Sequence, residues 1–323
     1  MILPELPERA VLFARRAARL RRLAEGHALG DYLRFLASLA EAQQAALDAF
    51  PEVPLPTERD LALARGHGLP PLSAGSWPRA HAWRSALRQI LGRAREQSGL
   101  PGAARLAIDR LGTLEESALE GVAGRLLATD LEAVEPAYAP LVAAALQVYW
   151  VHLTTALGAG AFPRIEPPSL CPACGSRPLA SVVLSGGETH GLRHLVCPLC
   201  ASQWHLVRAK CVACDSAKDL AYFALEPEDP DPLHPPAAAD AGAPPPAADA
   251  RSRQREAARR RPAVQAEACD GCRTYLKIFH VERDPGLEPT ADDLATVALD
   301  LQMTEAGYNR FGANPLLSLH SSG

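Results

Sequence analysis

The chain has few aromatic residues and no excess of positive charge. Phe, Trp and Tyr make up 5% of its 323 residues, and the formal net charge is −4. This balance disfavours a protein that binds a polyanion over its whole surface. Ala, Leu and Arg dominate the first half instead, a composition that favours helices.

Signatures of common enzyme classes are missing as well. The sequence has no Gly-rich phosphate loop, no Gly-x-Ser-x-Gly elbow, no His-Glu-x-x-His pair and no Cys-x-x-Cys pair in a thioredoxin-type context. We therefore predict that the protein is not an enzyme.

We expect neither an export signal nor a membrane span. Residues Met1 to Glu5 have neither the basic nor the apolar region of a signal peptide, which predicts a cytoplasmic protein. No charged residue occurs between Ala137 and Phe162, a stretch long enough to cross a bilayer. Because this stretch is rich in Ala and Gly, which insert only weakly, we predict a buried helix and no membrane contact.

Cysteine is confined to one region, and every cysteine belongs to a Cys-x-x-Cys pair, here called a knuckle. The four knuckles are Cys171/Cys174, Cys197/Cys200, Cys211/Cys214 and Cys269/Cys272. Two cysteines at this spacing can direct both sulfurs at one tetrahedral metal, about 2.3 Å away. Four knuckles therefore supply two four-thiolate sites. Disulfides are the alternative, but they rarely persist in a reducing compartment.

The order of elements around the knuckles occurs twice. Each copy reads knuckle, strand, return strand, knuckle and aromatic strand, first from Cys171 to Val207 and then from Cys211 to Phe279. The repeat predicts that consecutive knuckles share a metal. One site is then Cys171, Cys174, Cys197 and Cys200, and the other is Cys211, Cys214, Cys269 and Cys272. Three nearby histidines, His190, His194 and His205, are not expected as ligands, because each site already has four thiolates.

Residues 1–165 are predicted to be helical. Apolar residues at spacings of three and four indicate helices from Pro7, from Asp31 as N-cap, and over 79–98, 102–127 with a break near Gly112, and 131–158. A Pro/Gly-rich connection is expected between Pro51 and Pro78.

Arginines in the first helix lie mostly off its apolar stripe. They are Arg15, Arg16, Arg19, Arg21 and Arg22. This pattern is typical of a solvated face, and a surface for an acidic partner or nucleic acid is the alternative.

The second copy of the repeat contains a segment that cannot form a core. Residues 226–262 are rich in Pro, Ala and Asp and end in the basic tract from Arg251 to Arg261. We interpret them as a flexible insertion with a solvated tract. After it, Thr290 and Asp293 resemble a capping box, which predicts a last helix that ends near Gly307, followed by a loop.

These features predict an α+β fold. A helical domain (1–165) precedes two four-cysteine modules of rubredoxin or zinc-ribbon type, and a C-terminal helix and tail follow (284–323). The first module spans 166–210, and the second spans 211–283 with the insertion 226–262. Four tetrahedral thiolates suit zinc and iron alike.

The sequence resembles the FdhE family of formate dehydrogenase accessory proteins. The resemblance is carried by Cys-Pro-x-Cys-Gly-Ser from Cys171, Trp204-His-Leu-Val-Arg, Thr274-Tyr-Leu-Lys and Asp292-Asp-Leu-Ala, and it extends to Tyr32-Leu-Arg-Phe-Leu. Three departures are Ala201 and Arg273, which follow their knuckles, and the insertion; Arg273 stands where the family pattern suggests Gly.

The resemblance implies a cytoplasmic, non-catalytic factor. Such proteins support formation of active molybdenum-dependent formate dehydrogenase by acting on its catalytic subunit, and their cysteine sites resemble rubredoxin. Two metal ions per chain are therefore expected, with iron favoured over zinc, and the catalytic subunit is the expected partner. The alternative is a zinc-ribbon module that binds nucleic acid or protein through the tract 251–261. Self-association is left open.

Overall fold

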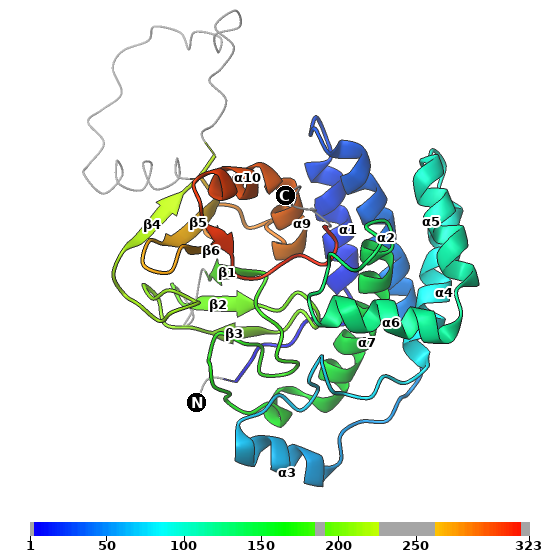
Figure 1. The fold of residues 1–323 in the computed structure, drawn as a ribbon, viewed down its shortest axis with the longest axis horizontal. Helices are drawn as coiled ribbons and strands as arrows, with labels where there is room; N and C mark the ends of the chain where they lie inside the picture. The colour runs from blue at the N-terminus through cyan, green and yellow to red at the C-terminus, as the bar shows by residue number, and fades with distance from the viewer. Residues whose placement is uncertain (1–2, 185–190, 226–261, 318–323) are drawn as a thin grey trace, which may run out of the picture.

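The computed structural model describes residues 3–184, 191–225 and 262–317 (Figure 1). Its helices are α1 (Leu12–Leu23), α2 (Gly30–Asp48), α3 (Glu58–His67), α4 (Ala82–Arg95), α5 (Gly102–Thr113), α6 (Glu116–Leu127), α7 (Ala139–Leu157), α9 (Pro289–Ala295) and α10 (Val297–Glu305), with a 3-10 turn η1 (Ala159–Ala161). Its strands are β1 (Ala180–Val183), β2 (Arg193–Val196), β3 (Gln203–His205), β4 (Leu220–Phe223), β5 (Val264–Cys269), β6 (Thr274–His280) and β7 (Asn309–Arg310). The insertion and its basic tract lie almost wholly outside the described residues.

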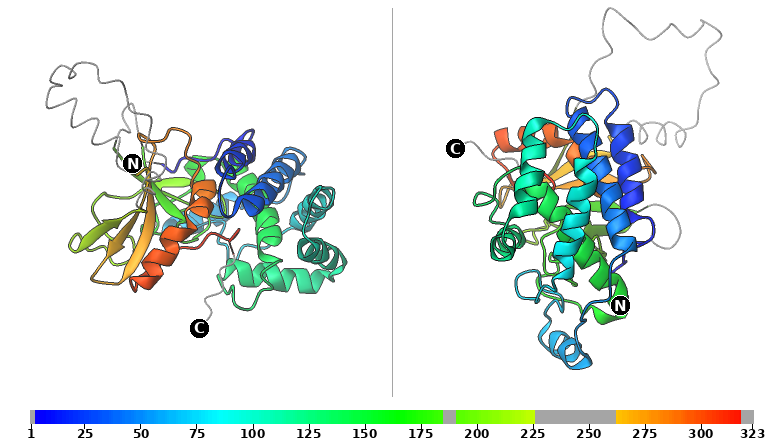
Figure 2. Two further views of the ribbon diagram at one scale, coloured as in Figure 1. Left: turned by 90° about the horizontal axis from the view of Figure 1, so that it is seen from above. Right: turned by 90° about the vertical axis from the view of Figure 1, so that its right-hand side faces the viewer.

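The helices and the sheet form two sides of the molecule, as the α+β prediction requires. Helices α1 to α7 lie on one side and the sheet on the other (Figure 2). Helix α9 packs against both α1 and β1, so it fills the space between the two sides. One continuous core contains residues of the helices together with all four cysteines of the first predicted site.

Helix α7 is the central helix of the N-terminal part. Within the described residues it alone is long and apolar enough to cross a membrane, and nearly all of it is buried. It packs on α2, α4 and α6. The prediction of an interior helix for this uncharged stretch is therefore confirmed.

Several helix boundaries differ from the sequence prediction. The predicted break near Gly112 is present, because α5 ends at Thr113 and α6 begins at Glu116. Asp31 is not an N-cap: α2 begins one residue earlier, and Asp31 pairs with Arg34 on the surface.

The expected connection between Pro51 and Pro78 contains a helix, α3. The Thr57 side chain accepts a hydrogen bond from Asp60 N, and the Asp60 carboxylate accepts one from Thr57 N, so the two residues form a capping box. Gly68 ends the helix at a φ of +60°.

Both copies of the repeat contribute to one sheet. Its strand order is β3-β2-β1-β6-β5-β4, and β7 pairs with β6. Within each copy the strands are antiparallel, while the copies are joined by parallel pairing of β1 with β6, where Ser181 lies opposite Ile278. A buried ion pair of 2.7 Å between Arg193 and Glu267 adds a second link between them.

The C-terminal segment forms two helices, where the sequence predicted one. They are separated at Thr296, and the cap of α9 is Glu288, whose side chain accepts from Ala291 N. Gly307 follows α10 at a φ of +78°, as predicted. The tail expected as loop supplies β7.

Two arginines of α1 are buried against this C-terminal segment. Arg16 pairs with Glu288 at 3.1 Å, and Arg19 pairs with Asp292 at 2.5 Å and Asp284 at 2.6 Å. The prediction of a solvated face is therefore wrong for these two residues. A charge withdrawn from water needs an opposite partner, and the acids of residues 284–292 supply it.

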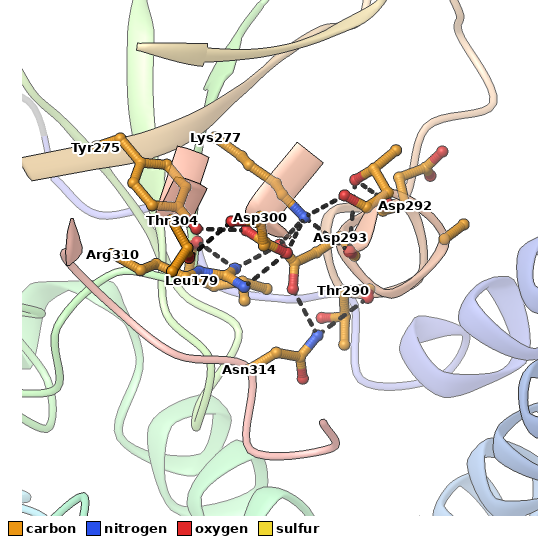
Figure 3. Close-up of polar contacts among 12 residues, drawn as sticks. Leu179, Tyr275, Lys277, Thr290, Asp292, Asp293, Asp300, Thr304, Arg310 and Asn314 are labelled. Carbon is orange, nitrogen blue, oxygen red and sulfur yellow. Dashed lines mark hydrogen bonds and ion pairs between the residues drawn. The ribbon is translucent and has the colours of Figure 1, made fainter. Parts of the chain in front are cut away.

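A second group of buried charges holds α9 and α10 to the sheet (Figure 3). Lys277 of β6 is fully buried and lies 2.7 Å from Asp300 and 3.2 Å from Asp293. Arg310 pairs with the same two carboxylates, and Asn314 donates to Asp293. Burial opposes ionisation of Asp293, but Arg310 and Lys277 outweigh it and lower the pKa of this carboxyl below its ordinary value.

Candidate metal centres

The same pairing of residues five apart closes each knuckle. In three of them the amide of the first cysteine donates to the carbonyl of a serine: Cys171 to Ser176 (3.0 Å), Cys197 to Ser202 (2.9 Å) and Cys211 to Ser216 (2.8 Å). In the fourth, Cys269 of β5 lies opposite Thr274 of β6. The sequence carries this signal as Cys-x-x-Cys-x-Ser, with Thr274 at the same place in the fourth copy. The serines of the later knuckles could therefore have been identified from the sequence as part of the turn.

The residue after each knuckle adopts a left-handed backbone conformation. These residues are Gly175 (φ +76°), Ala201 (+57°), Asp215 (+59°) and Arg273 (+54°). The knuckle turn therefore has the same shape in all four copies, although only one copy has the glycine that this conformation favours.

The structure brings the eight predicted cysteines together in two groups, paired as the repeat predicts. We call Cys171, Cys174, Cys197 and Cys200 the first cluster, and Cys211, Cys214, Cys269 and Cys272 the second cluster. In each cluster the four Sγ atoms lie within 4.8 Å of one another.

The sulfur spacing fits a tetrahedral metal. Sγ–Sγ distances in the first cluster include 3.4 Å for Cys174–Cys197 and 3.6 Å for Cys171–Cys200. In the second cluster Cys211–Cys272 measures 3.6 Å and Cys214–Cys269 measures 3.8 Å. Four sulfurs about 2.3 Å from a central metal would be about 3.8 Å apart. A disulfide would require about 2.05 Å. Each cluster can therefore hold one metal ion.

Electrostatics in the first cluster also favour a bound cation. Burial raises the pKa of the Cys171 and Cys197 thiols well above their usual value. Burial acts in the same direction on Cys200, but hydrogen bonds from the neighbouring thiols and from Ser202 lower its pKa well below the usual value. Four buried thiolates thus need a positive charge among them, and metal binding is expected to release protons.

The N-terminal helical part contacts the first cluster on both knuckles. Leu72 N donates to Ala173 O (3.0 Å), and Ala74 N donates to Cys174 O (2.8 Å). On the other knuckle, Gln147 Nε2 of α7 donates to Pro198 O (2.8 Å). The first cluster is therefore enclosed between the sheet and the helices.

Arg273 connects the second cluster to helix α10. Its guanidinium donates to the carbonyls of Ala306 and Gly307 at the end of the helix and lies 3.9 Å from the centroid of the Tyr308 ring. A cation at a helix C-terminus is favourable, as is its stacking on an aromatic ring. These contacts explain how an arginine occupies a position where the family pattern suggests glycine.

The nearby histidines lie outside both clusters in the described part of the chain. His194 is buried on β2, and its ring is 6.0 Å from that of His205. His190 lies outside the described residues. His27, His67, His81 and His152 are distributed over the helical part.

Comparison with known proteins shows similarity along nearly the whole chain. Family models match as "FdhE, N-terminal" (residues 3–166), "FdhE, central domain" (170–208) and "FdhE, C-terminal domain" (249–317). A protein FdhE homolog of Pseudomonas aeruginosa is 40% identical over 95% of this chain and 90% of its own length. One of Edwardsiella ictaluri is 38% identical over 97% of this chain and 90% of its own length.

A solved structure shares the architecture. The crystal structure of the FdhE protein from Pseudomonas aeruginosa matches with a TM-score of 0.79 and 36% identity, covering 98% of this chain and 99% of that chain. Agreement at this level, together with the two cysteine clusters, supports the α+β prediction for the chain as a whole.

Proposed function

Because the chain belongs to the FdhE family, we propose that it is a formate dehydrogenase accessory protein that binds the catalytic subunit of that enzyme in the cytoplasm, with iron at each cluster. One observation carries the proposal: a chain of FdhE architecture keeps two complete four-cysteine clusters with tetrahedral spacing.

The four cysteine ligands of each cluster support a non-catalytic role. When four thiolates surround one metal, no coordination position is left for a substrate. Cysteine sulfur suits iron as well as zinc, and iron in such a site supplies one-electron chemistry. The residues of this chain position the sulfurs of both clusters, and those of the first cluster are also shielded from water.

Co-purification tests the partner and metal assignments together. The tagged chain is co-expressed with the formate dehydrogenase catalytic subunit and isolated without oxygen. We expect the subunit to co-elute, with two irons per chain, one for each cluster, and visible thiolate-to-iron charge-transfer bands. A double variant, Cys211→Ser with Cys214→Ser, should lose one iron, while Arg88→Ala, exposed on α4, should retain both.

Other outcomes would contradict parts of the proposal. A colourless protein with two zincs would overturn the iron assignment. Failure to retain the subunit, with salt-dependent RNA binding that is lost on deletion of residues 251–261, would favour the alternative nucleic-acid module.

A further inference from the structure

The two clusters differ in their access to solvent. All four cysteines of the first cluster are buried, none with more than 2% of its surface exposed. In the second cluster Cys211 and Cys269 are buried, whereas Cys272 is partly exposed and Cys214 is exposed. A reagent in water can therefore reach cysteine residues of the second cluster, whereas those of the first are accessible only after local unfolding.

The serine and threonine hydroxyls of the knuckles have different hydrogen-bond partners in the two clusters. Ser176 Oγ lies 3.2 Å from Cys174 Sγ, and Ser202 Oγ lies 3.3 Å from Cys200 Sγ, so both can donate to thiolates of the first cluster. Ser216 instead donates to the backbone carbonyl of Lys218 (3.4 Å), and Thr274 to that of Cys272 (3.3 Å). Within the described residues, the hydroxyls of Ser216 and Thr274 are therefore directed to the backbone, whereas those of Ser176 and Ser202 are placed to stabilise thiolates.

The helical part is hydrogen-bonded to both knuckles of the first cluster. The turn after β2 and the turn between β5 and β6 lie at the same end of the strands, because β1 and β6 are parallel, but they differ in their neighbours. Opening the first cluster requires the hydrogen bonds from Leu72, Ala74 and Gln147 to break. The second cluster is tied to α10 through Arg273, a residue that is itself exposed.

We propose that the two clusters have different roles: the first holds its metal within the core and releases it only slowly, and the second is an exchangeable centre that metal chelators and thiol-directed reagents reach at Cys214. This inference rests on metal binding by both clusters, which is part of the proposed function. The exposed centre is the one whose state can respond to the metal supply of the cell.

Exchange at the second cluster is a ligand substitution. A donor atom of the chelator bonds to the metal as the metal–Sγ bond of Cys214 breaks, and the freed thiolate takes up a proton from water. The remaining metal–sulfur bonds are replaced in the same way. No electron is transferred, so the step needs no oxidant or reductant.

Metal release from the whole chain tests the proposal. The zinc-loaded protein is mixed with excess coloured chelator, and release is followed by absorbance. We expect two phases of equal amplitude, the second at least about tenfold slower because it requires local opening of the core. Iodoacetamide labelling followed by peptide mass mapping should modify Cys214 first and the cysteines of the first cluster last.

Matched variants assign the phases. Cys214→Ser should remove the fast phase and leave the slow one. Ser202→Ala should accelerate the slow phase several-fold, because it removes a hydroxyl donor from Cys200, whereas Ser216→Ala should leave both phases unchanged. The labelling map of the unmodified protein stands as a separate test if a variant does not fold.

Two results would overturn the inference. Release of two metals at one rate, or earliest labelling in the first cluster, would contradict it and leave the proposed function intact. A chain that binds no metal would overturn the metal assignment of the proposed function and this inference together.

Discussion

Gln147 of α7 donates a hydrogen bond of 2.8 Å to the carbonyl oxygen of Pro198, inside the knuckle formed by Cys197 and Cys200. Its Oε1 atom accepts from Gln43 at 2.9 Å and from Arg16 at 3.3 Å. A buried chain of polar contacts therefore runs from α1 and α2 to the first cluster.

Gln147→Leu should weaken both the fold and the first cluster. The substitution leaves Pro198 O without its donor and removes the acceptor shared by Gln43 and Arg16, at a cost of about 1–3 kcal/mol in unfolding free energy. Denaturant unfolding measures the loss, and chelator-driven release should show a faster slow phase. Gln302→Leu, exposed on α10, is the control. Unchanged stability in Gln147→Leu would show that this chain of contacts contributes nothing.

Arg273 should stabilise the folded protein more than alanine or glycine would at this left-handed backbone position. Arg273→Ala loses the contacts with Ala306, Gly307 and Tyr308 and retains the unfavourable φ. Arg273→Gly loses the same contacts but relieves the backbone, so it should be more stable than the alanine variant by about 1 kcal/mol. Unfolding of the metal-loaded proteins gives this order. Equal stability of the two variants would mean that the backbone is not strained.

Lys277→Met should be among the most damaging single substitutions. It removes one of two cations that balance the buried carboxylates of Asp293 and Asp300, and breaking a buried charge pair in this way costs about 3–5 kcal/mol. Thermal or denaturant unfolding measures the effect, with exposed Lys218→Met as the control. A loss below about 1 kcal/mol would show that Arg310 alone suffices.

His152 should make stability depend on pH. Burial, followed by the positive charge of Arg9, lowers the pKa of its ring below the ordinary value of 6.5. Arg9 approaches its Nδ1 atom at 3.0 Å, which requires the neutral ring. The unfolded chain therefore takes up a proton more readily, and this contribution is present above about pH 6.5 and is lost as the pH falls through the lowered pKa.

Comparison of denaturant midpoints at pH 7.5 and 5.5 tests this pH dependence. His152→Gln should lose less stability on acidification than the unmodified protein, whereas His81→Gln, exposed on the surface, should behave like the unmodified protein. A His152 variant with an unchanged pH dependence would contradict the assignment.

The local features of the clusters were predictable, because cysteine spacing and the repeated order of elements act over short distances. From these two signals we predicted the strands around the knuckles. They also predicted that Cys171 groups with Cys197 and that Cys211 groups with Cys269. The helix over 58–67 could also have been predicted, since Thr57 and Asp60 have the spacing of a capping box.

The long-range contacts were not predictable from such patterns. Nothing local in β1 or β6 specifies their parallel pairing, which brings Ser181 opposite Ile278. Similarly, the spacing of Arg16 and Arg19 indicates an exposed face, and their burial depends on acids in residues 284–292. Amphipathic periodicity reports which residues avoid water, but it does not identify a distant partner for a charge.

The pairing of α1 with residues 284–292 joins two segments that are synthesised far apart in time. Arg16 and Arg19 leave the ribosome long before Asp284 and Asp292 exist, so their guanidinium groups must remain hydrated while the intervening chain is made. A copy whose translation stops before Asp284 would retain its first helix but lack the acids that allow these cations to enter the core. Such a truncated copy would keep this surface open, and a protease or chaperone could distinguish it from one whose synthesis went on past Asp292.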